Sequence, residues 1–245
     1  MTEKKVIVTG AAGGIGKACV QRFLSEGCRV AALDRNAEGL NVLASLSQPP
    51  ELIFNLDITN RSSLSQVFGQ IQEKWNTVDI LINNAGISVR ALATETSNES
   101  WIEVLNTNLN GVFYCARESY PLMNKMGGVI INMGSVNGMV GMPFYASYNA
   151  AKAGVIELTR TLALEWAPSI RVVCLCPGYV LTPMQYAEYS AEQMAVLNAR
   201  IPLGRHAFPE EIAALCAFIA SDEAPILTGC TVVADGGETA GGLAS

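Results

Sequence analysis

The 245-residue sequence contains a single histidine, His206, and its seven cysteines lie at irregular spacings without a Cys-X-X-Cys pair. Zinc sites are built from clusters of cysteine and histidine at short spacings, so no metal site is predicted. We expect His206 to lie in a loop. We expect the cysteines to be reduced and packed as small hydrophobic side chains, as they are in cytoplasmic proteins.

Positive charge and long apolar runs are scarce as well. Sixteen Lys and Arg residues stand against 22 Asp and Glu residues, which gives a formal net charge of -6, and no basic cluster occurs. Neither nucleic acid nor an anionic membrane surface is therefore an expected partner. The apolar run that ends at Gly10 is shorter than a signal-peptide core, and no later run is long enough to cross a bilayer. A cytoplasmic location is expected.

Hydrophobic residues make up 50% of the chain, which is enough for a sizeable core. Short apolar runs that predict strands alternate along the chain with segments that predict helices. This alternation predicts an α/β fold, a Rossmann-like doubly wound parallel sheet with helices on both faces. Because no linker or internal repeat occurs, residues 1–245 are expected to form one domain. The seven strands are expected at residues 5–8, 29–33, 52–56, 78–82, 129–133, 170–176 and 231–234.

A glycine-rich turn joins the first expected strand to the first expected helix, with Gly10, Gly14 and Gly16 in a GxxxGxG spacing. Glycine lets the backbone approach a pyrophosphate, and the positive N-terminal end of the following helix attracts its charge. The spacing differs from the commoner GxGxxG fingerprint of dinucleotide-binding folds. A glycine-rich turn without a ligand is the alternative.

Asp34 ends the second expected strand, twenty residues after Gly14. A carboxylate at about this distance can accept hydrogen bonds from the adenosine ribose hydroxyls and would repel a 2′-phosphate. Both effects favour NAD over NADP. Arg35 acts against this interpretation, because an arginine could pair with that phosphate. The alternative for Asp34 is a solvated residue at the start of a turn.

Polar and small residues mark two further places in the chain. The segment Asn83-Asn84-Ala85-Gly86 follows the fourth expected strand and suits either a cleft for a flat ring or a plain turn. A long helix is expected over residues 97–125, although its middle reads Asn106-Thr107-Asn108-Leu109-Asn110. Asparagine forms helices poorly. We therefore expect either a local distortion that frees a backbone carbonyl for a water or a side chain, or a polar outer face.

Tyr148 and Lys152 lie four residues apart in an Ala-rich segment that predicts a helix over residues 145–166. Positions i and i+4 share one helix face, so the phenol and the ammonium would project together. The ammonium favours the phenolate and would lower the pKa of Tyr148, which allows proton transfer with an alcohol. Ser135, at the end of the fifth expected strand, could hold the oxygen of a substrate. A bare YxxxK pattern is common in helices, so the interpretation depends on the rest of the chain.

Taken together, these motifs resemble the short-chain dehydrogenase/reductase family, in its compact form of about 250 residues, from about residue 5 to 237. The resemblance adds LDI at 56–58 as an adenine-side motif and PGYVLTP at 177–183 as a segment that contacts the nicotinamide carboxamide. It implies four catalytic residues, Asn108, Ser135, Tyr148 and Lys152. The residues that it implies for cofactor binding are Gly10, Gly14, Ile15, Gly16, Asp34, Asp57, Ile58, Asn84, Ala85, Gly86, Tyr148, Lys152, Pro177, Gly178, Val180 and Thr182.

The resemblance also implies a role for each catalytic residue. Tyr148 would be the acid/base, and Lys152 would lower the Tyr148 pKa and bind the nicotinamide ribose. Ser135 would position the substrate oxygen, and Asn108 would hold a water that links Lys152 to solvent. A homotetramer is implied, formed mainly through the helices at 97–125 and 145–166.

The expected function is NAD-dependent oxidation of a secondary alcohol, polyol, sugar or hydroxy compound to the ketone, or the reverse reaction. Two alternatives stay open. One is an NADPH-dependent 3-oxoacyl-thioester reductase, which Asp34 disfavours, and the other is a nucleotide-binding regulator without catalysis, which the intact catalytic set disfavours.

The substrate itself is not predicted. A mixed segment rich in Met, Tyr and Ala, at about 184–205, is expected to be a partly helical insertion that covers the cleft. Together with residues 88–93 and 136–145 it would line the substrate pocket. The Gly- and Ala-rich tail from Glu238 to Ser245 is expected to fray.

Overall fold

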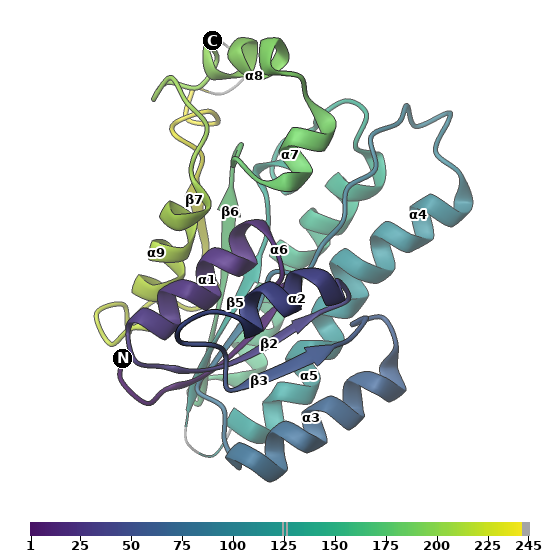
Figure 1. Cartoon of the computed structure of the whole chain (residues 1–245). Coiled ribbons are helices and arrows are strands. Elements are labelled where there is room, and N and C mark those ends of the chain that lie inside the picture. Colours follow the sequence, from purple (N-terminus) through teal and green to yellow (C-terminus); the bar gives the residue numbers. More distant parts are fainter. Residues whose placement is uncertain (124, 126, 242–245) are drawn as a thin grey trace.

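A computed structural model describes residues 1–123, 125 and 127–241. Within them the chain forms one sheet of seven parallel strands in the order β3-β2-β1-β4-β5-β6-β7, which confirms the predicted fold class (Figure 1). The strands are β1 (Lys5–Thr9), β2 (Arg29–Asp34), β3 (Leu52–Asn55), β4 (Ile80–Asn83), β5 (Gly128–Met133), β6 (Ile170–Pro177) and β7 (Thr231–Ala234).

The strands read as continuous apolar runs because helices cover both faces of the sheet. Val6, Ile7 and Val8 of β1 are all fully buried. The strand order reverses between β1 and β4, since β1 pairs with β2 on one side and with β4 on the other. In open α/β sheets ligands bind in the crevice at the carboxyl ends of the strands beside such a reversal.

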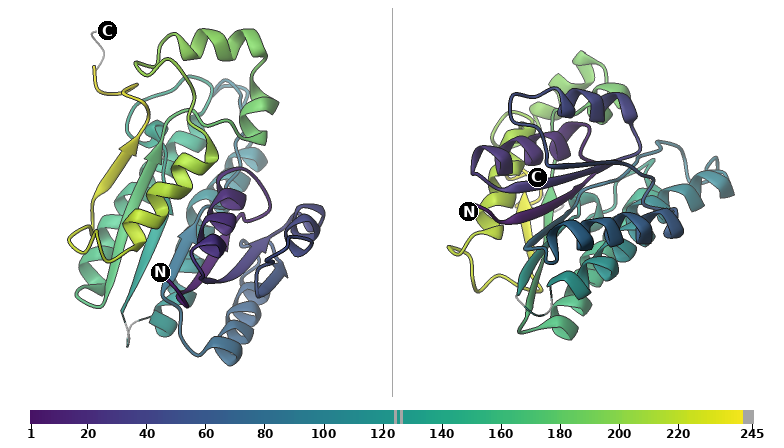
Figure 2. Two further views of the ribbon diagram at one scale, coloured as in Figure 1. Left: turned by 60° about the vertical axis from the view of Figure 1, so that its left-hand side comes forward. Right: turned by 60° about the horizontal axis from the view of Figure 1, so that its bottom comes forward.

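Two helical layers enclose the sheet (Figure 2). The helices α1 (Gly14–Ser25), α2 (Ala37–Ala44) and α9 (Pro209–Ala220) pack on one face, around a core that includes Phe23 and Leu43. The opposite core includes Phe68, Met123 and Leu162. It lies under α3 (Arg61–Trp75), α5 (Gly111–Met123) and α6 (Ala146–Trp166).

The expected helix at 97–125 is interrupted. It consists of α4 (Asn98–Leu105), a π-helical turn, η1 (Asn106–Asn110), and then α5. The π turn contains the three asparagines, so the local distortion that their weak helix propensity predicts is present.

The expected insertion at about 184–205 contains two short helices, α7 (Pro183–Glu188) and α8 (Ala191–Asn198). They stand beyond the carboxyl ends of the strands, at the top of Figure 1. Both helices are capped by hydroxyls: Thr182 Oγ1 accepts from the Gln185 amide and Ser190 Oγ from the Gln193 amide. In the described part of the chain no helix is long and apolar enough to span a bilayer.

Candidate active site

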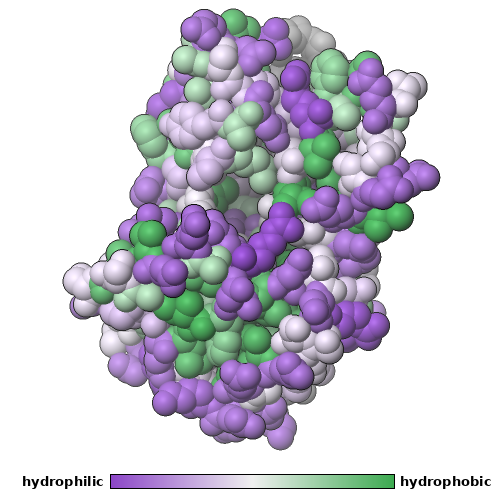
Figure 3. All heavy atoms as spheres, turned by 45° about the vertical axis from the view of Figure 1, so that its right-hand side comes forward, coloured by the Kyte–Doolittle hydropathy of each residue, from purple (hydrophilic) through white to green (hydrophobic). Residues whose placement is uncertain are grey.

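A cavity of about 390 Å³ opens at the carboxyl ends of the strands. A hollow is visible near the middle of the face shown in Figure 3. The volume lies within the range of small-molecule and cofactor sites. Most of the residues predicted for the site line this cavity, namely Gly10, Gly14, Ile15, Asp34, Asp57, Ile58, Asn84, Ala85, Gly86, Ser135, Tyr148, Lys152, Pro177, Gly178, Val180 and Thr182. The two exceptions, Gly16 and Asn108, lie behind its wall.

The glycine turn follows β1 and leads into α1. Gly10 and Gly14 adopt positive φ angles of 62° and 50°, which glycine tolerates best. Gly16 is required for a different reason, because a Cβ there would stand 1.9 Å from the carbonyl oxygen of Gly10. The N-cap residue of α1, Gly13, has no side chain to bond the first amides, and no acidic residue lies in the first turn. The helix therefore presents free N–H groups and a positive end to the cavity, which suits a pyrophosphate.

Asp34 is held rigidly at the end of β2. One carboxylate oxygen, Oδ2, accepts from the Ala12 amide at 2.9 Å, and the other accepts from the Asn36 amide at 2.8 Å. Each oxygen keeps a lone pair for a further donor. Arg35 also lines the cavity, and its guanidinium stands 3.9 Å from Glu103 in an exposed pair. The carboxylate therefore lines the cavity at the end of β2, and its contact with an adenosine ribose stays a prediction.

Asn84 connects the middle of the cavity floor to β1. Its side-chain amide donates to the carbonyl oxygens of Thr9 and Gly10 at 3.2 and 3.1 Å. The hydroxyl of Thr9 accepts from the backbone amides of Asn84 and Ala85, both at 3.1 Å. These bonds keep the small residues after β4 close to the glycine turn, so the segment is more than a plain turn.

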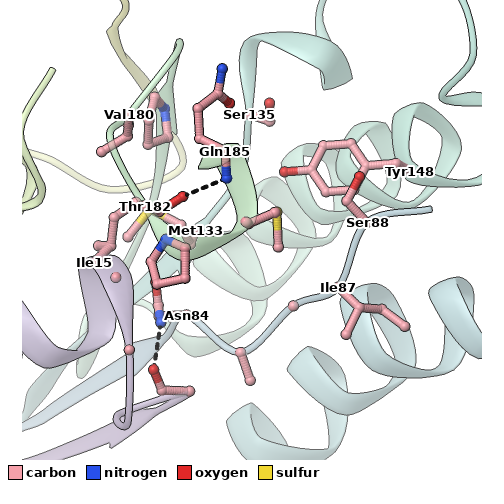
Figure 4. Close-up of a pocket in the computed structure, with 18 of the residues that line it drawn as sticks. Ile15, Asn84, Ile87, Ser88, Met133, Ser135, Tyr148, Val180, Thr182 and Gln185 are labelled. Atoms are coloured by element: carbon pink, nitrogen blue, oxygen red, sulfur yellow. Dashed lines mark hydrogen bonds between the residues drawn. The ribbon is translucent and has the colours of Figure 1, made fainter. Parts of the chain in front are cut away.

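Tyr148 lies near the start of α6, and its hydroxyl points into the pocket (Figure 4). Burial raises the pKa of Tyr148 to about 12, and a hydrogen bond with Ser135 opposes this increase. The expectation that the Lys152 ammonium lowers the pKa of Tyr148 is therefore wrong for the protein on its own, because desolvation by burial raises that pKa. Ser135 follows β5, is buried, and accepts from the Asn137 amide at 3.2 Å.

Lys152 lies on the same face of α6, with its Nζ 5.6 Å from the centroid of the Tyr148 ring. The side chain is 3% exposed, and Nζ donates to the Met133 carbonyl oxygen at 2.6 Å. Burial lowers the pKa of Lys152 to about 8, so the amine is mostly protonated at neutral pH. The predicted juxtaposition of phenol and ammonium is present, and two donors of the ammonium stay available.

Asn108 lies in the π turn and is fully buried. Its Oδ1 accepts from the Ile87 amide and its Nδ2 donates to the Ile87 carbonyl, each at 2.8 Å. The side chain thereby fixes the loop after β4. Oδ1 also lies close to Gly86, whose Cβ, if present, would be 3.4 Å from it and 3.8 Å from Lys152 Nζ. To hold the predicted water, the Asn108 side chain would have to use the lone pair and the N–H that do not bond to Ile87.

Residues of α7 and the loop after it close the cavity from above. The Tyr145 hydroxyl donates to Glu188 at 2.5 Å and lies 2.8 Å from the Tyr189 hydroxyl. Gln185 Nε2 lies 3.0 Å from Nε2 of His206, whose Nδ1 is 2.6 Å from Asn198 Oδ1. His206 lies in a loop, as expected, but it is 2% exposed and links α7 to α8.

Comparison with known proteins assigns the chain to a family. A family model described as "Enoyl-(Acyl carrier protein) reductase" matches residues 10–239. Meso-2,3-butanediol dehydrogenase of Serratia marcescens is 36% identical over 97% of this chain and 95% of that protein. A 3-oxoacyl-[acyl-carrier-protein] reductase of Thermotoga maritima is 40% identical over 96% and 97%, respectively. The crystal structure of levodione reductase superposes with a TM-score of 0.92 at 29% identity, covering 98% of this chain and 99% of that one.

The chain belongs to the short-chain dehydrogenase/reductase family. It is an oxidoreductase that acts on CH–OH groups and interconverts a secondary alcohol and a ketone with a nicotinamide cofactor. The cavity fits that cofactor, since free helix amides, a fixed carboxylate and a protonated amine line one continuous wall.

Two features of this short-chain dehydrogenase/reductase were missed in the sequence. The first is a buried polar chain beneath the site, in which Asn83 donates to Asn132 at 2.9 Å and Asn132 donates to Thr159 at 3.0 Å. It joins β4, β5 and α6. The sequence signal that could have indicated this chain is an asparagine in each of two neighbouring apolar strands.

The second feature is Glu238, which was expected to lie in a fraying tail. Its side chain instead lines the cavity, because the turn after β7 folds back onto the enzyme. Burial, with a smaller contribution from Asp235, raises the pKa of Glu238 to about 7. No sequence pattern placed this carboxyl group beside the site.

Proposed function

We propose that the protein is an NAD-dependent dehydrogenase of secondary alcohols. One observation carries this proposal: a single cavity has the fixed carboxylate of Asp34 at one end, and Ser135, Tyr148 and Lys152 at the other. The glycine turn and the amino end of α1 lie between them. An extended dinucleotide would fit this arrangement, with its adenosine at the carboxylate, its pyrophosphate at the glycine turn and its nicotinamide at the proton-transfer residues.

Cofactor preference is assigned to Asp34. Backbone amides hold both of its oxygens in place, so the carboxylate cannot swing away from a ribose. A 2′-phosphate there would meet a fixed negative charge, whereas two ribose hydroxyls could donate to it. The Arg35 guanidinium is exposed and turned towards Glu103, which weakens it as a phosphate partner.

The proton transfer is assigned to Tyr148. In the oxidative direction the Tyr148 phenolate accepts the proton of the substrate hydroxyl, while Ser135 holds the substrate oxygen by a hydrogen bond. Lys152 lies close enough to stabilise the phenolate and has free donors for ribose hydroxyls. Asn108 keeps the Ile87 segment in place beside Lys152. When bound, NAD⁺ would accept hydride from the carbinol carbon and would add a positive charge that favours the phenolate.

A second function, reduction of a 3-oxoacyl thioester, is supported by the 40% identity to the Thermotoga maritima reductase. Asp34 favours NAD, and reductive synthesis usually draws on NADPH. A regulator without catalysis is disfavoured because the cavity brings Ser135, Tyr148 and Lys152 together.

Absorbance at 340 nm separates these functions. We expect the purified protein to form NADH from NAD and a secondary alcohol, with kcat/KM for NAD at least 10-fold above that for NADP. Asp34→Ala should reduce this ratio several-fold, while Arg35→Ala should leave NAD preferred. Unchanged relative KM values for the two cofactors in Asp34→Ala would refute the assignment.

A homotetramer is also proposed. Exposed apolar side chains on α4, α5 and α6, among them Trp101, Ile102, Phe113 and Leu164, support an interface on these helices. Light scattering should give four times the mass of one chain, and a monomer would refute it.

A further inference from the structure

The end of the cavity beside Tyr148 is rich in oxygen-bearing side chains. Two carboxylates, those of Glu188 and Glu238, line it, and only Arg35 and Lys152 carry positive charge among all the residues described as lining the cavity. Arg35 lies at the opposite end, where the adenosine is proposed to bind. The Lys152 ammonium donates a hydrogen bond to the Met133 carbonyl oxygen. The neutral polar residues at this end are Ser88, Ser135, Asn137, Tyr145, Tyr148, Tyr179, Gln185 and Tyr189.

Glu238 is held firmly in this position by the turn after β7. Asp235 anchors the turn by accepting from the Gly237 amide at 2.9 Å and from the Thr239 amide and hydroxyl at 2.8 and 2.6 Å. Gly236 packs so closely that a Cβ there would lie 2.8 Å from Ile201. Leu203 also donates its amide to the Gly236 carbonyl at 3.1 Å. The position of Glu238 therefore follows from bonds on both sides of it.

The carboxyl group of Glu238 lies against the start of the nicotinamide-side segment. A Cβ added to Gly178 would stand 2.9 Å from Glu238 Oε2. Oε2 is buried and has no hydrogen-bond partner among the described residues. A carboxylate oxygen without a donor is costly to bury, so a donor supplied by a ligand would stabilise it.

Ser88 gives a second, independent observation of the same kind. Its Oγ is buried without a hydrogen-bond partner among the described residues, and Ser88 lines the same cavity as Tyr148 (Figure 4). The substrate end of the cavity thus holds two hydrogen-bonding groups that the described protein leaves unpaired, apart from the groups assigned to proton transfer.

We propose that the substrate is a small neutral diol or polyol, one hydroxyl of which reacts at Tyr148 while a neighbouring hydroxyl donates to Glu238. This proposal rests on the proposed function. Oxidation breaks the C–H and O–H bonds of one carbinol, the hydride passing to NAD⁺ and the proton to Tyr148, and yields a hydroxyketone and NADH. The two carboxylates would repel the carboxylate of a hydroxy acid.

Three matched substrates test the class: 2,3-butanediol, 2-butanol and 3-hydroxybutyrate. At pH 8, above the Glu238 pKa of about 7, we expect kcat/KM for the diol to exceed that for 2-butanol about 10- to 100-fold, since the lost bond is to a charged group. The hydroxy acid should be poorer still. Equal rates for the diol and 2-butanol, or a preference for the hydroxy acid, would overturn the proposal.

The residue assignment is tested by Glu238→Gln, which keeps the shape and removes the charge. We expect kcat/KM for the diol to fall about 10-fold, mainly through KM, while kcat/KM for 2-butanol changes less than about 2-fold. The exposed Glu95→Gln serves as control and should change neither. Equal losses on both substrates would assign Glu238 a structural role instead. If no alcohol is oxidised with NAD or NADP, the proposed function fails first, whereas turnover without diol preference defeats only this inference.

Discussion

At the scale of single residues, burial controls the titration of the site more than neighbouring charges do. It raises the pKa of Tyr148 to about 12 and lowers that of Lys152 to about 8. Both shifts have the same cause, because removal from water disfavours the charged form of each group. Sequence spacing predicted the meeting of the two groups correctly, but it carries no information on how deeply a helix face is buried.

Glu238 should make stability depend on pH. Its folded pKa of about 7 lies above the ordinary value of 4.5, so the folded protein holds this proton more tightly than the unfolded chain. Its stabilising effect is complete below pH 4.5 and is lost as the pH rises through 7.

Glu238→Gln removes this dependence. We expect the Tm of the variant relative to wild type to be about 2 °C higher at pH 8 than at pH 4.5, a small effect because the side chain is only half-buried. Differential scanning calorimetry at both pH values provides the measurement. A difference that is the same at both, or larger at pH 4.5, would contradict the assigned titration.

At the scale of elements, the sequence predicts what local patterns encode. All seven strands were expected near their observed bounds, because strands buried on both faces are continuous apolar runs. Asn60 caps α3, where its side chain accepts from the Ser63 amide at 3.1 Å. The helix at 97–125 was expected to have either a local distortion or a polar outer face at 106–110, and a π turn there divides it. The asparagines signalled a distortion but not its form, which depends on the bonds of Asn108 to Ile87.

The glycine turn offers a matched pair of substitutions. A Cβ at Gly16 would overlap the Gly10 carbonyl at 1.9 Å, whereas at Gly13 nothing lies within 4 Å. We expect Gly16→Ala to lower the free energy of unfolding by about 3 kcal/mol or more, and Gly13→Ala to change it by less than about 0.5 kcal/mol. Urea unfolding measures both. Equal effects would show that the turn does not pack as described.

At the scale of the whole molecule, the two ends of the cavity differ in how far they could be predicted. The cofactor end is built from turns directly after β1, β2, β3 and β4, so short motifs such as Gly10–Gly16 and Asn83–Gly86 indicated it. The substrate end is assembled from distant segments: the loop at Ser88, α7 and the turn at Glu238. Only long-range packing, such as the contact of Leu203 with Gly236, brings these together, and no local pattern encodes it.

The central claim is that Tyr148 transfers the proton beside bound NAD. Tyr148→Phe removes one hydroxyl from the cavity, while Tyr186→Phe removes one from a side chain that is 58% exposed and outside the cavity wall. Single-turnover formation of NADH from the best alcohol, with NAD affinity measured in parallel, tests the claim directly. We expect Tyr148→Phe to bind NAD within about 3-fold of wild type and to lose at least 100-fold in rate, with Tyr186→Phe unchanged. A Tyr148→Phe rate within a few-fold of wild type would contradict the account.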